Sequence, residues 1–304
     1  MAAVGEIIAA ADYNTIRQKV ANILGVGSAQ SGYGQNLNAA VDVDPLDADV
    51  LKRRITKAQW DALRFDIINA RVHQVDVAPT LTVVSTTDPV KYGASHPNYQ
   101  YNTVANDVVT DKFIVAPSQA IITSATSATK STAWVNVQSC TLTVTFTTAD
   151  QARYFWNSGG KLRFTSSRTG GISSAQNTAW TNLLSAAGTQ DFSAVSSGQN
   201  AYSLTTSYQT WYTIGSSLPY NLNNYTIQVK ADTANSSGTA RIFYFNIVWT
   251  DGHYDVGSPP PPGDYVDGTL SISVAELRAA GTMLPSGTFA ITPPTYSITS
   301  ISGS

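Results

Sequence analysis

The chain has few of the residues that carry most protein chemistry. Its 304 residues include one cysteine, three histidines and two methionines, and only 12% of them are charged. One cysteine cannot form an internal disulfide, and three separated histidines do not make a cluster with metal-ligand spacing. Acidic residues are too sparse to supply a carboxylate pair of the kind that hydrolyses glycosides. We therefore expect no catalytic residue, no metal site and no cofactor, and the chain is not predicted to be an enzyme.

Charge of one sign and long apolar runs are also missing. The net charge is −2 and the basic residues are scattered, which excludes a basic surface for nucleic acid. Residues 1–11 contain short apolar pieces, but Glu6 interrupts them and no Lys or Arg precedes them, so they are interpreted as a terminus docked on a neighbour. No run approaches the length of a membrane span. Neither nucleic acid nor a membrane is expected as a partner, and the protein is expected to be soluble.

Three motifs resemble known sites but fail on spacing. The aspartates of residues 42–49 lack the Gly and Glu that an EF-hand loop needs at its sixth and twelfth positions. The glycine-rich residues 25–34 lack the Gly-Lys-Ser/Thr ending of a phosphate loop. His253 lies between Asp251 and Asp255, but no second ligand pair or nucleophile accompanies it. We interpret these segments as a solvated loop, a loop that wraps around a neighbour and a structural turn.

Two helices are predicted in the charge-rich N-terminal part, which holds 16 of the 38 charged residues within residues 1–72. Asp12 is expected to cap a helix that ends at Gly25, and Thr56 and Gln59 form a capping box for the second helix. The second helix has two apolar stripes, which are Trp60, Leu63, Ile67 and Ala70 on one face and Phe65, Ile68 and Val72 on another. Burial inside one domain explains both stripes, and so does a helix shared with another subunit. Candidate oligomer or attachment residues are therefore Trp60, Phe65, Ile67 and Ile68.

Alternation with period two begins near residue 78 and predicts a β-rich body. Strands are expected at residues 80–85, 108–115, 133–147, 161–167, 208–214, 225–231 and 239–250. The last strand is apolar on both faces, which is typical of a central strand. Cys140 lies on an alternating strand and is interpreted as a buried structural thiol. A further short helix at residues 175–187 is expected to close one end of this body.

The C-terminal part follows a proline-rich spacer at residues 257–263. Ser273 and Glu276 match a capping box and predict a short helix that ends at Gly281. Residues 288–301 alternate but contain two prolines, which is typical of an edge strand or of a tail lying on a partner. The predicted fold class is mainly β, with an antiparallel β-sandwich body, a helical N-terminal region and a short C-terminal appendage. The predicted domains are residues 1–77 (helical attachment region), 78–256 (sandwich body), 257–263 (polyproline linker) and 264–304 (appendage).

Aromatic residues concentrate in the second half of the predicted body, at Tyr202, Tyr208, Trp211, Tyr212, Tyr220 and Tyr225. Tyrosine is common on strands, so the faces of the sandwich explain this concentration. Rings next to Ser and Asn also form sugar-binding platforms when they are coplanar and exposed. The candidate glycan contacts are Trp211, Tyr212 and Tyr220.

The most distinctive segment runs from Thr148 to Gly171. Thr148 is a suitable N-cap, and Ala152, Phe155 and Trp156 fall on one face of a short helix. Asn157 and two glycines end that helix, and residues 161–164 then alternate as a half-buried strand does. No nucleophile, base or metal-ligand set accompanies these residues. The segment therefore predicts a helix-to-strand packing corner.

This corner is also where the sequence resembles a known group. Residues 154–164 (YFWNSGGKLRF), 167–171 (SRTGG), 178–184 (TAWTNLL) and 204–208 (LTTSY) look like a module in structural proteins of tailed bacteriophages. Residues 13–35, which end in LGVGSAQSGYGQ, and residues 55–64 (ITKAQWDALR) are similar to the same group. The module is reused at several positions in virions and brings no catalytic residues to transfer.

The resemblance implies a structural component located in the virion. A tail fibre, collar or baseplate-proximal appendage that assembles through its N-terminal region is the first expectation. A capsid decoration or neck protein is the alternative, and a carbohydrate-binding β-sandwich module for host recognition is the second alternative. The implied partners are other virion proteins and further copies of the chain in a homo-oligomer, with a host surface glycan in the carbohydrate-binding case.

Overall fold

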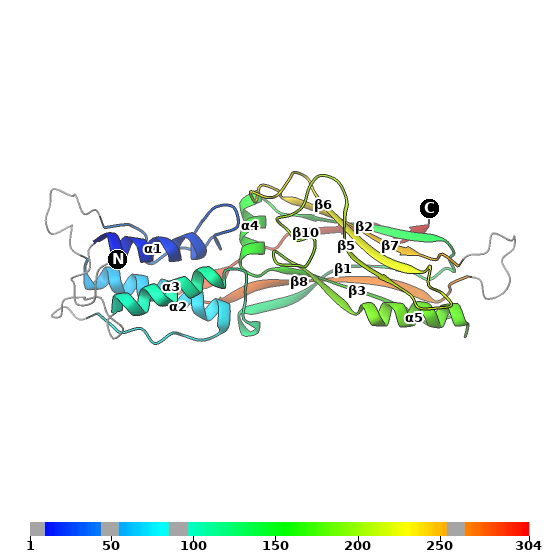
Figure 1. Cartoon of the computed structure of the whole chain (residues 1–304), viewed down its shortest axis with the longest axis horizontal. Coiled ribbons are helices and arrows are strands. Elements are labelled where there is room, and N and C mark those ends of the chain that lie inside the picture. Colours follow the sequence, from blue (N-terminus) through cyan, green and yellow to red (C-terminus); the bar gives the residue numbers. More distant parts are fainter. Residues whose placement is uncertain (1–9, 44–54, 85–96, 254–264, 304) are drawn as a thin grey trace. The chain divides into compact units, whose positions relative to one another are not determined.

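The computed structural model describes residues 10–43, 55–84, 97–253 and 265–303 (Figure 1). The predicted spacer at residues 257–263 lies outside the described residues. Two compact units make up the chain. The helical unit comprises Met1–Ile121, Arg153–Gly159 and Arg278–Thr292, and the sandwich unit comprises Ile122–Ala152, Gly160–Leu277 and Pro293–Ser304.

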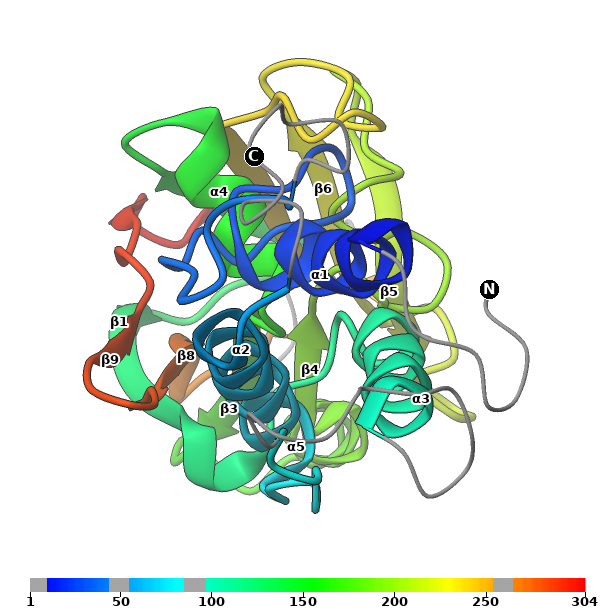
Figure 2. The same cartoon turned by 90° about the vertical axis from the view of Figure 1, so that its left-hand side faces the viewer.

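The helical unit contains three helices that pack on one another (Figure 2). They are α1 (Ala10–Leu24), α2 (Lys57–Val75) and α3 (Pro97–Thr110), followed by the 3-10 turn η1 (Pro117–Gln119). Aromatic rings join them, because the ring of Trp60 lies edge-on to Tyr13 at 5.2 Å and to Tyr101 at 5.1 Å. All three side chains are almost fully buried. The core of this unit is therefore an aromatic contact among three helices.

The start of α2 agrees with its sequence signal. The Thr56 side chain accepts a hydrogen bond from the Gln59 amide, and the Gln59 side chain accepts one from the Thr56 amide, which confirms the capping box. The helix ends at Asp76 in the left-handed conformation. The predicted inner stripe is confirmed as buried, at Trp60, Leu63, Ile67 and Ala70.

Three predictions in the helical unit are wrong. Residues 108–110 belong to helix α3 and not to a strand, because Tyr101, Ala105 and Val108 recur at helical spacing and are fully buried. Residues 80–84 form no strand. Asp12 lies in the first turn of α1 instead of capping it, since the helix already includes Ala10.

Two antiparallel sheets form the sandwich unit, apart from their strand residues at 120–121 and 278–290, which belong to the helical unit. The first sheet has the order β1-β8-β3-β4, with β9 paired to β8, and the second has the order β10-β2-β7-β6-β5, with β11 paired to β2. Their bounds are β1 Ala120–Lys130, β2 Val137–Thr145, β3 Lys161–Thr169, β4 Thr189–Phe192, β5 Gln209–Gly215, β6 Asn224–Ala231, β7 Ile242–Thr250, β8 Thr269–Thr282, β9 Thr288–Ala290, β10 Thr295–Ile298 and β11 Ser302–Gly303. This architecture confirms the predicted class of an antiparallel β-sandwich with a helical N-terminal region.

The two sheets meet through the apolar face of β7, which lies between β2 and β6 as predicted for a central strand. The ring of Phe245 lies 4.9 Å from Phe164 and 5.1 Å from Phe192 of the opposite sheet. The indole of Trp249 donates a hydrogen bond to the Ser166 hydroxyl at 3.0 Å. These residues form the core between the sheets.

The predicted helix at Ser273–Glu276 is wrong, because these residues lie in strand β8. Leu270, Ile272, Val274 and Glu276 are buried on alternate positions, and the strand pairs with β3 over nine residue pairs from Thr269 to Leu277. Period-two burial therefore prevails over the local capping pattern. Residues 288–301 were predicted as an edge strand or as a tail lying on a partner. Part of this segment, β10, is an edge strand that pairs with β2 in the second sheet.

The helix-to-strand corner also forms as predicted. Helix α4 spans Ala149–Asn157, and the Thr148 hydroxyl accepts a hydrogen bond from the Gln151 amide at 3.1 Å. Gly159 takes a left-handed conformation (φ +85°) before β3 begins at Lys161. Helix α5 (Ala175–Ala187) packs on β3, and its Trp180 meets Trp134 edge-on at 5.0 Å.

Candidate functional site

The candidate site begins at the loop after α1, which folds back on the end of that helix. The amide of Tyr33 donates to the Ile23 carbonyl at 2.8 Å, and the amide of Gly34 donates to the Gly25 carbonyl at 2.8 Å. Tyr33 is fully buried within the chain. The loop at residues 25–34 is therefore folded on its own helix.

The distinctive helix α4 holds this loop from the other side. The Arg153 guanidinium donates to the carbonyl oxygens of Val26 at 2.7 Å and Ser31 at 2.6 Å. Asn157 donates from its side-chain amide to the Gly32 carbonyl at 3.2 Å. A β-carbon on Gly34 would lie 2.3 Å from the Tyr154 ring, so this close approach requires glycine. We call Arg153, Asn157 and the loop at residues 25–34 the α4 clamp.

His73 of α2 joins the same region. Its Nε2 lies 3.1 Å from the Ser158 carbonyl, so Nε2 carries the proton and donates. Its ring stacks on Phe289 at 4.2 Å with 8° between the planes, and Tyr33 packs against it at 5.0 Å. Burial lowers the pKa of His73 to about 3. The ring is therefore neutral near pH 7 and serves as a packing surface.

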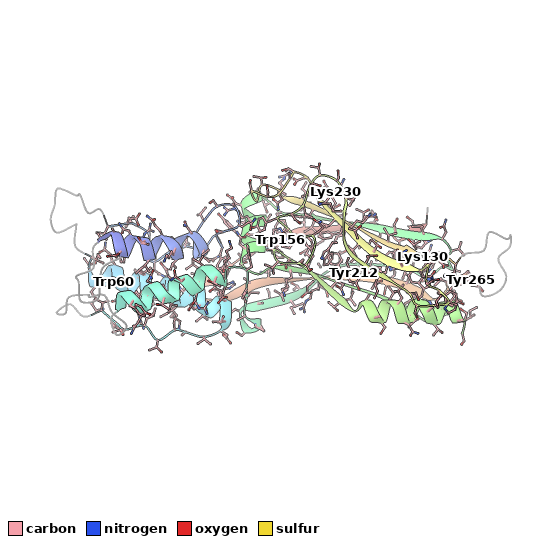
Figure 3. The ribbon with its side chains drawn as sticks, viewed as in Figure 1. Trp60, Lys130, Trp156, Tyr212, Lys230 and Tyr265 are labelled. Carbon is pink, nitrogen blue, oxygen red and sulfur yellow. The ribbon has the colours of Figure 1, made fainter. Side chains whose placement is uncertain are left out.

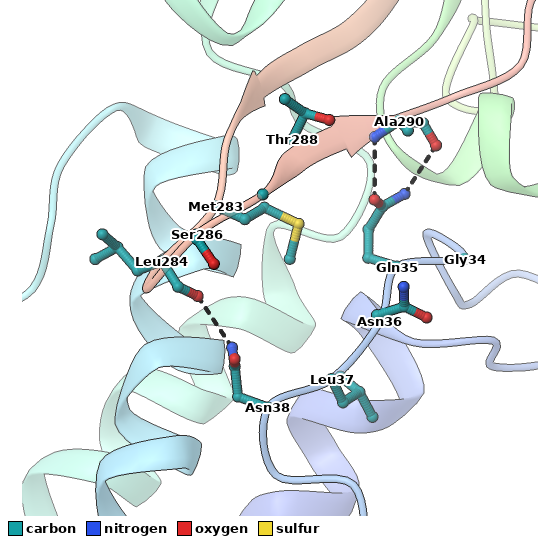
Figure 4. A pocket seen from close by; sticks show the side chains of 11 residues that line it. Gly34, Gln35, Asn36, Leu37, Asn38, Met283, Leu284, Ser286, Thr288 and Ala290 are labelled. Atoms are coloured by element: carbon teal, nitrogen blue, oxygen red, sulfur yellow. Dashed lines mark hydrogen bonds between the residues drawn. The ribbon is translucent and has the colours of Figure 1, made fainter.

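A hairpin formed by β8 and β9 is held by two side-chain amides, of which Figure 4 shows that of Gln35. Gln35 donates to the Ala290 carbonyl at 3.2 Å and accepts from the Ala290 amide at 3.1 Å. Asn69 does the same at Leu284, with distances of 2.9 Å and 2.7 Å. Each amide takes the place of a neighbouring strand residue. Sequence reasoning missed these contacts because Gln35 and Asn69 lie more than 200 residues from their partners.

A pocket of about 310 Å³ lies beside Gln35 and the hairpin. Its lining comes from residues 34–38 and from Met283, Leu284, Ser286, Gly287, Thr288 and Ala290. These residues carry amide, hydroxyl and apolar groups and no charged side chain, so the pocket has no acid, base or nucleophile of high reactivity. Asp66 lies beneath the loop and accepts from the amides of Asn38 and Ala39 at 2.9 and 2.8 Å. Burial raises the pKa of Asp66 and these hydrogen bonds oppose the rise.

A second polar cluster lies in the sandwich unit and uses the SRTGG segment. The Arg168 guanidinium lies 3.3 Å from the Asp267 carboxylate and donates to the Gly170 carbonyl at 3.0 Å and to the Thr181 hydroxyl at 3.2 Å. Asn177 donates to Asp267 at 2.5 Å and accepts from the Asp267 amide at 3.1 Å. We call Arg168, Asn177 and Asp267 the Arg168 cluster. It joins the end of β3, the start of α5 and the start of β8.

Gly171 is required at this cluster for two reasons. Its φ of +81° is a left-handed conformation, and a β-carbon there would lie 2.2 Å from the Asp267 carboxylate and 2.7 Å from the Arg168 guanidinium. Gly170 has a similar φ of +72°, but a β-carbon there would meet no atom within 4 Å. Gly171 is thus required both by its backbone conformation and by the side chains of the cluster. Gly170 is required by its backbone conformation alone.

The structure places the four predicted attachment residues on α2, where Figure 3 labels Trp60, and their exposure is unequal. Trp60, Ile67 and Ile68 are buried inside the chain, at 1%, 0% and 5% exposure. Phe65 is partly exposed, and Arg64 lies over its ring at 5.8 Å. Of the four residues, Phe65 keeps the most surface for a partner.

The predicted glycan contacts do not form one flat platform. Strand β5 has a bulge at Trp211, and the ring of this residue packs edge-on against Phe164 at 5.6 Å and Phe192 at 5.0 Å of the core. The planes of Trp211 and Tyr212 are inclined by 55°. Tyr220 lies on the following loop, edge-on to His253 at 5.3 Å. The three rings are partly buried. They therefore do not form the coplanar, exposed set that a sugar-binding platform needs.

The remaining motifs are held by ordinary structural contacts. His253 accepts a hydrogen bond from the Leu222 amide at 3.1 Å, while Asp255 lies outside the described residues. In the aspartate-rich loop only Asp42 and Val43 are described, and a hydrogen bond from Arg17 lowers the pKa of Asp42. Cys140 is buried as predicted, and burial raises its pKa to about 12.

The described residues contain no group of three or more His, Cys, Asp or Glu side chains placed to hold a metal ion. None of the helices in the described segments has the length and apolar character needed to cross a bilayer. A comparison with protein-family models, with characterised proteins and with solved structures found no match.

Proposed function

We propose that this chain is a structural component of a tailed-phage virion that has no catalytic activity. A tail fibre, collar or baseplate-proximal appendage is the first choice, with other virion proteins and further copies of the chain as partners. The support comes from the sequence resemblance at residues 13–35, 55–64, 154–164, 167–171, 178–184 and 204–208. The physical argument concerns what the side chains in those segments do.

The observation that carries the proposal is the use of polar groups in the α4 clamp and the Arg168 cluster. Arg153 and Asn157 donate to backbone carbonyls of the chain itself, and Arg168 donates to a carbonyl, a hydroxyl and a carboxylate of the chain. Groups that are engaged in this way hold segments together and are not presented to a substrate. The segments that carry the resemblance therefore serve construction, as expected for a particle component.

Attachment through the N-terminal region is part of the proposal, and the surface around Phe65 is its best candidate. A Phe65→Asp variant is expected to fold as the parent does and to lose incorporation into particles. Ile68→Asp is the matched control on the same helix, since it buries a charge and is expected to unfold the helical unit. If Phe65→Asp folds and is incorporated as well as the parent, attachment through this surface is wrong.

Two alternatives remain as proposals. A decoration or neck protein would use the same contacts, and only its position in the particle differs. A carbohydrate-binding module would use Tyr220, because the Trp211 ring packs against Phe192 of the core. Glycan-array binding that is lost in Tyr220→Ala at unchanged stability favours this alternative, and absence of binding by the parent excludes it.

The proposal is tested on purified particles of the phage that encodes the chain. Gold-labelled antibody against the protein is expected to decorate the particles at the tail or its attachment region. Label at the head-tail junction or on the capsid favours the neck or decoration alternative. A protein that is absent from particles and that cleaves polysaccharide as a purified monomer contradicts the proposal.

A further inference from the structure

Strand β1 forms an unprotected edge of the first sheet. It runs over 11 residues, from Ala120 to Lys130, and lies at the end of the strand order beside β8. None of its residues is buried, and Ile122 is 57% exposed. Among the described residues no strand pairs with its second edge. One side of β1 therefore presents a row of free backbone donors and acceptors.

The other three sheet edges carry features that oppose pairing. Strands β4 and β10 have only four residues each, and β10 follows two prolines. Strand β5 has a bulge between Thr210 and Tyr212. Short strands, prolines and bulges are the means by which natural sheets prevent association at their edges. Strand β1 is long, has no proline, and has a single charge, on its last residue Lys130 (Figure 3).

We propose that β1 pairs with β1 of a second copy of this chain, antiparallel and about a two-fold axis, so that two first sheets join into one. A foreign peptide that adds to a sheet edge is selected by pockets for its alternate side chains. Strand β1 offers mainly Ala, Ser and Thr side chains, and neither the pocket beside Gln35 nor the one lined by Thr165 and Leu184 includes any of its residues. Self-pairing needs no such pocket.

The charge pattern favours the antiparallel arrangement. The first ten residues of β1 are uncharged, so no like charges face each other at the centre of the pair. A two-fold axis near the middle of the strand places the two Lys130 side chains at opposite ends, roughly 30 Å apart at about 3.4 Å per residue. A parallel pair would set these charges side by side, which is destabilising. Pairing also covers Ile122, which β8 leaves exposed.

This inference does not rest on the proposed function. It uses the edge of the sandwich, whereas the proposed attachment uses Phe65 of α2. A dimer that forms through β1 leaves the virion assignment open, and a chain located in the particle can still lack this dimer. The two proposals therefore fail on different measurements.

The test measures mass and amide exchange of the full chain over a hundredfold range of protein concentration. The parent is expected to be a dimer at the upper end, with β1 amides that exchange at least tenfold more slowly there than in the dilute monomer. In an antiparallel strand the amides of successive residues point to opposite neighbours. Hence one of Ser124→Pro and Ala125→Pro blocks the free edge and the other removes a bond to β8.

The edge-blocking variant is expected to unfold as the parent does and to raise the dimer dissociation constant at least tenfold. The control is Leu218→Ser, which changes a 79% exposed apolar side chain on the loop between β5 and β6. This variant is expected to dimerise as the parent does. A parent that is monomeric throughout, or a folded dimer that persists in both proline variants, overturns the proposal. If neither proline variant folds, amide exchange of β1 that is independent of concentration in the parent overturns it.

Discussion

Arg153 donates a hydrogen bond to the carbonyl oxygen of Val26, 127 residues earlier in the chain, at 2.7 Å. This contact joins the two segments that set the sequence apart, which are the glycine-rich loop after α1 and the aromatic helix α4. Their unusual residues are explained by the way they fit each other.

Removing the Arg153 guanidinium is expected to weaken the helical unit. Arg153→Met keeps the aliphatic stem but leaves the Val26 and Ser31 carbonyls without this donor, so the free energy of unfolding should fall by about 2 kcal/mol. The control is Arg163→Met, which breaks a partly exposed ion pair with Asp191 and should cost less than about 1 kcal/mol. Urea unfolding of both variants measures the difference. Equal losses would contradict the role of the clamp.

The paired glycines of the SRTGG segment are expected to respond differently to alanine. Gly170→Ala meets no neighbouring atom and should cost only the left-handed conformation, about 1 kcal/mol. Gly171→Ala also forces the Asp267 carboxylate away from Arg168, so its loss should be larger by at least about 1 kcal/mol. Thermal unfolding of the two variants compares them. The account of the cluster is wrong if Gly171→Ala is the milder change.

Acid is expected to destabilise the protein through His73. Burial holds its pKa at about 3 in the folded chain, below the ordinary value of 6.5. Between these values the unfolded chain binds more protons, so the free energy of unfolding falls as the pH falls through this window. At about pH 4.5 the loss from this residue alone should approach 3 kcal/mol.

The matched variant for this prediction is His73→Gln, which retains a donor for the Ser158 carbonyl and does not titrate. Asp66 acts in the opposite sense, because its raised pKa adds stability as the pH falls. Its effect is present in both proteins and cancels in their difference. The stability difference between parent and variant should therefore change with pH between about 4.5 and 7. A constant difference would show that His73 does not titrate as its burial requires.

Cys140 is expected to be inert in the folded protein. Burial raises the pKa of its thiol to about 12, so little thiolate is present near pH 7 and reagents cannot reach the sulfur. Labelling with a maleimide should be slow in the native protein and rapid in denaturant, at one thiol per chain. Rapid labelling of the native protein would contradict the burial of β2.

The sequence predicted an element correctly where a few neighbouring residues determine its structure. The Thr56–Gln59 capping box, the Thr148 cap of α4 and the alternation of β7 all appear as predicted. In each case the residues that give the signal also make the contacts. The fold class follows from these elements together.

The failures occur where distant contacts outweigh local preference. Val108 favours a strand by residue type, yet its face is buried against α1 and α2, so the segment is helical. Ser273 and Glu276 imitate a capping box, but alternate burial between β1 and β3 makes them part of a strand. Strand β1 was not predicted, because neither of its faces is buried and its sequence shows no apolar alternation.

The candidate site could be anticipated only in part. Sequence reasoning identified the aromatic face of α4 and the glycines around it. It could not show which carbonyls Arg153 and Arg168 would reach, because those partners are set by the tertiary fold. Trp211 was named as a candidate glycan contact, with a place on the faces of the sandwich as the alternative. Its ring packs against Phe192 beside a bulge that gives no signal in composition.

The most direct test of the proposed function is an electron cryo-microscopy reconstruction of the whole phage particle in which we propose that this chain is a component. The account predicts density for α1–α3 at an attachment point on the particle, followed by the two antiparallel sheets, in several symmetry-related copies. Particles whose complete reconstruction and protein composition contain no copy of the chain would contradict it.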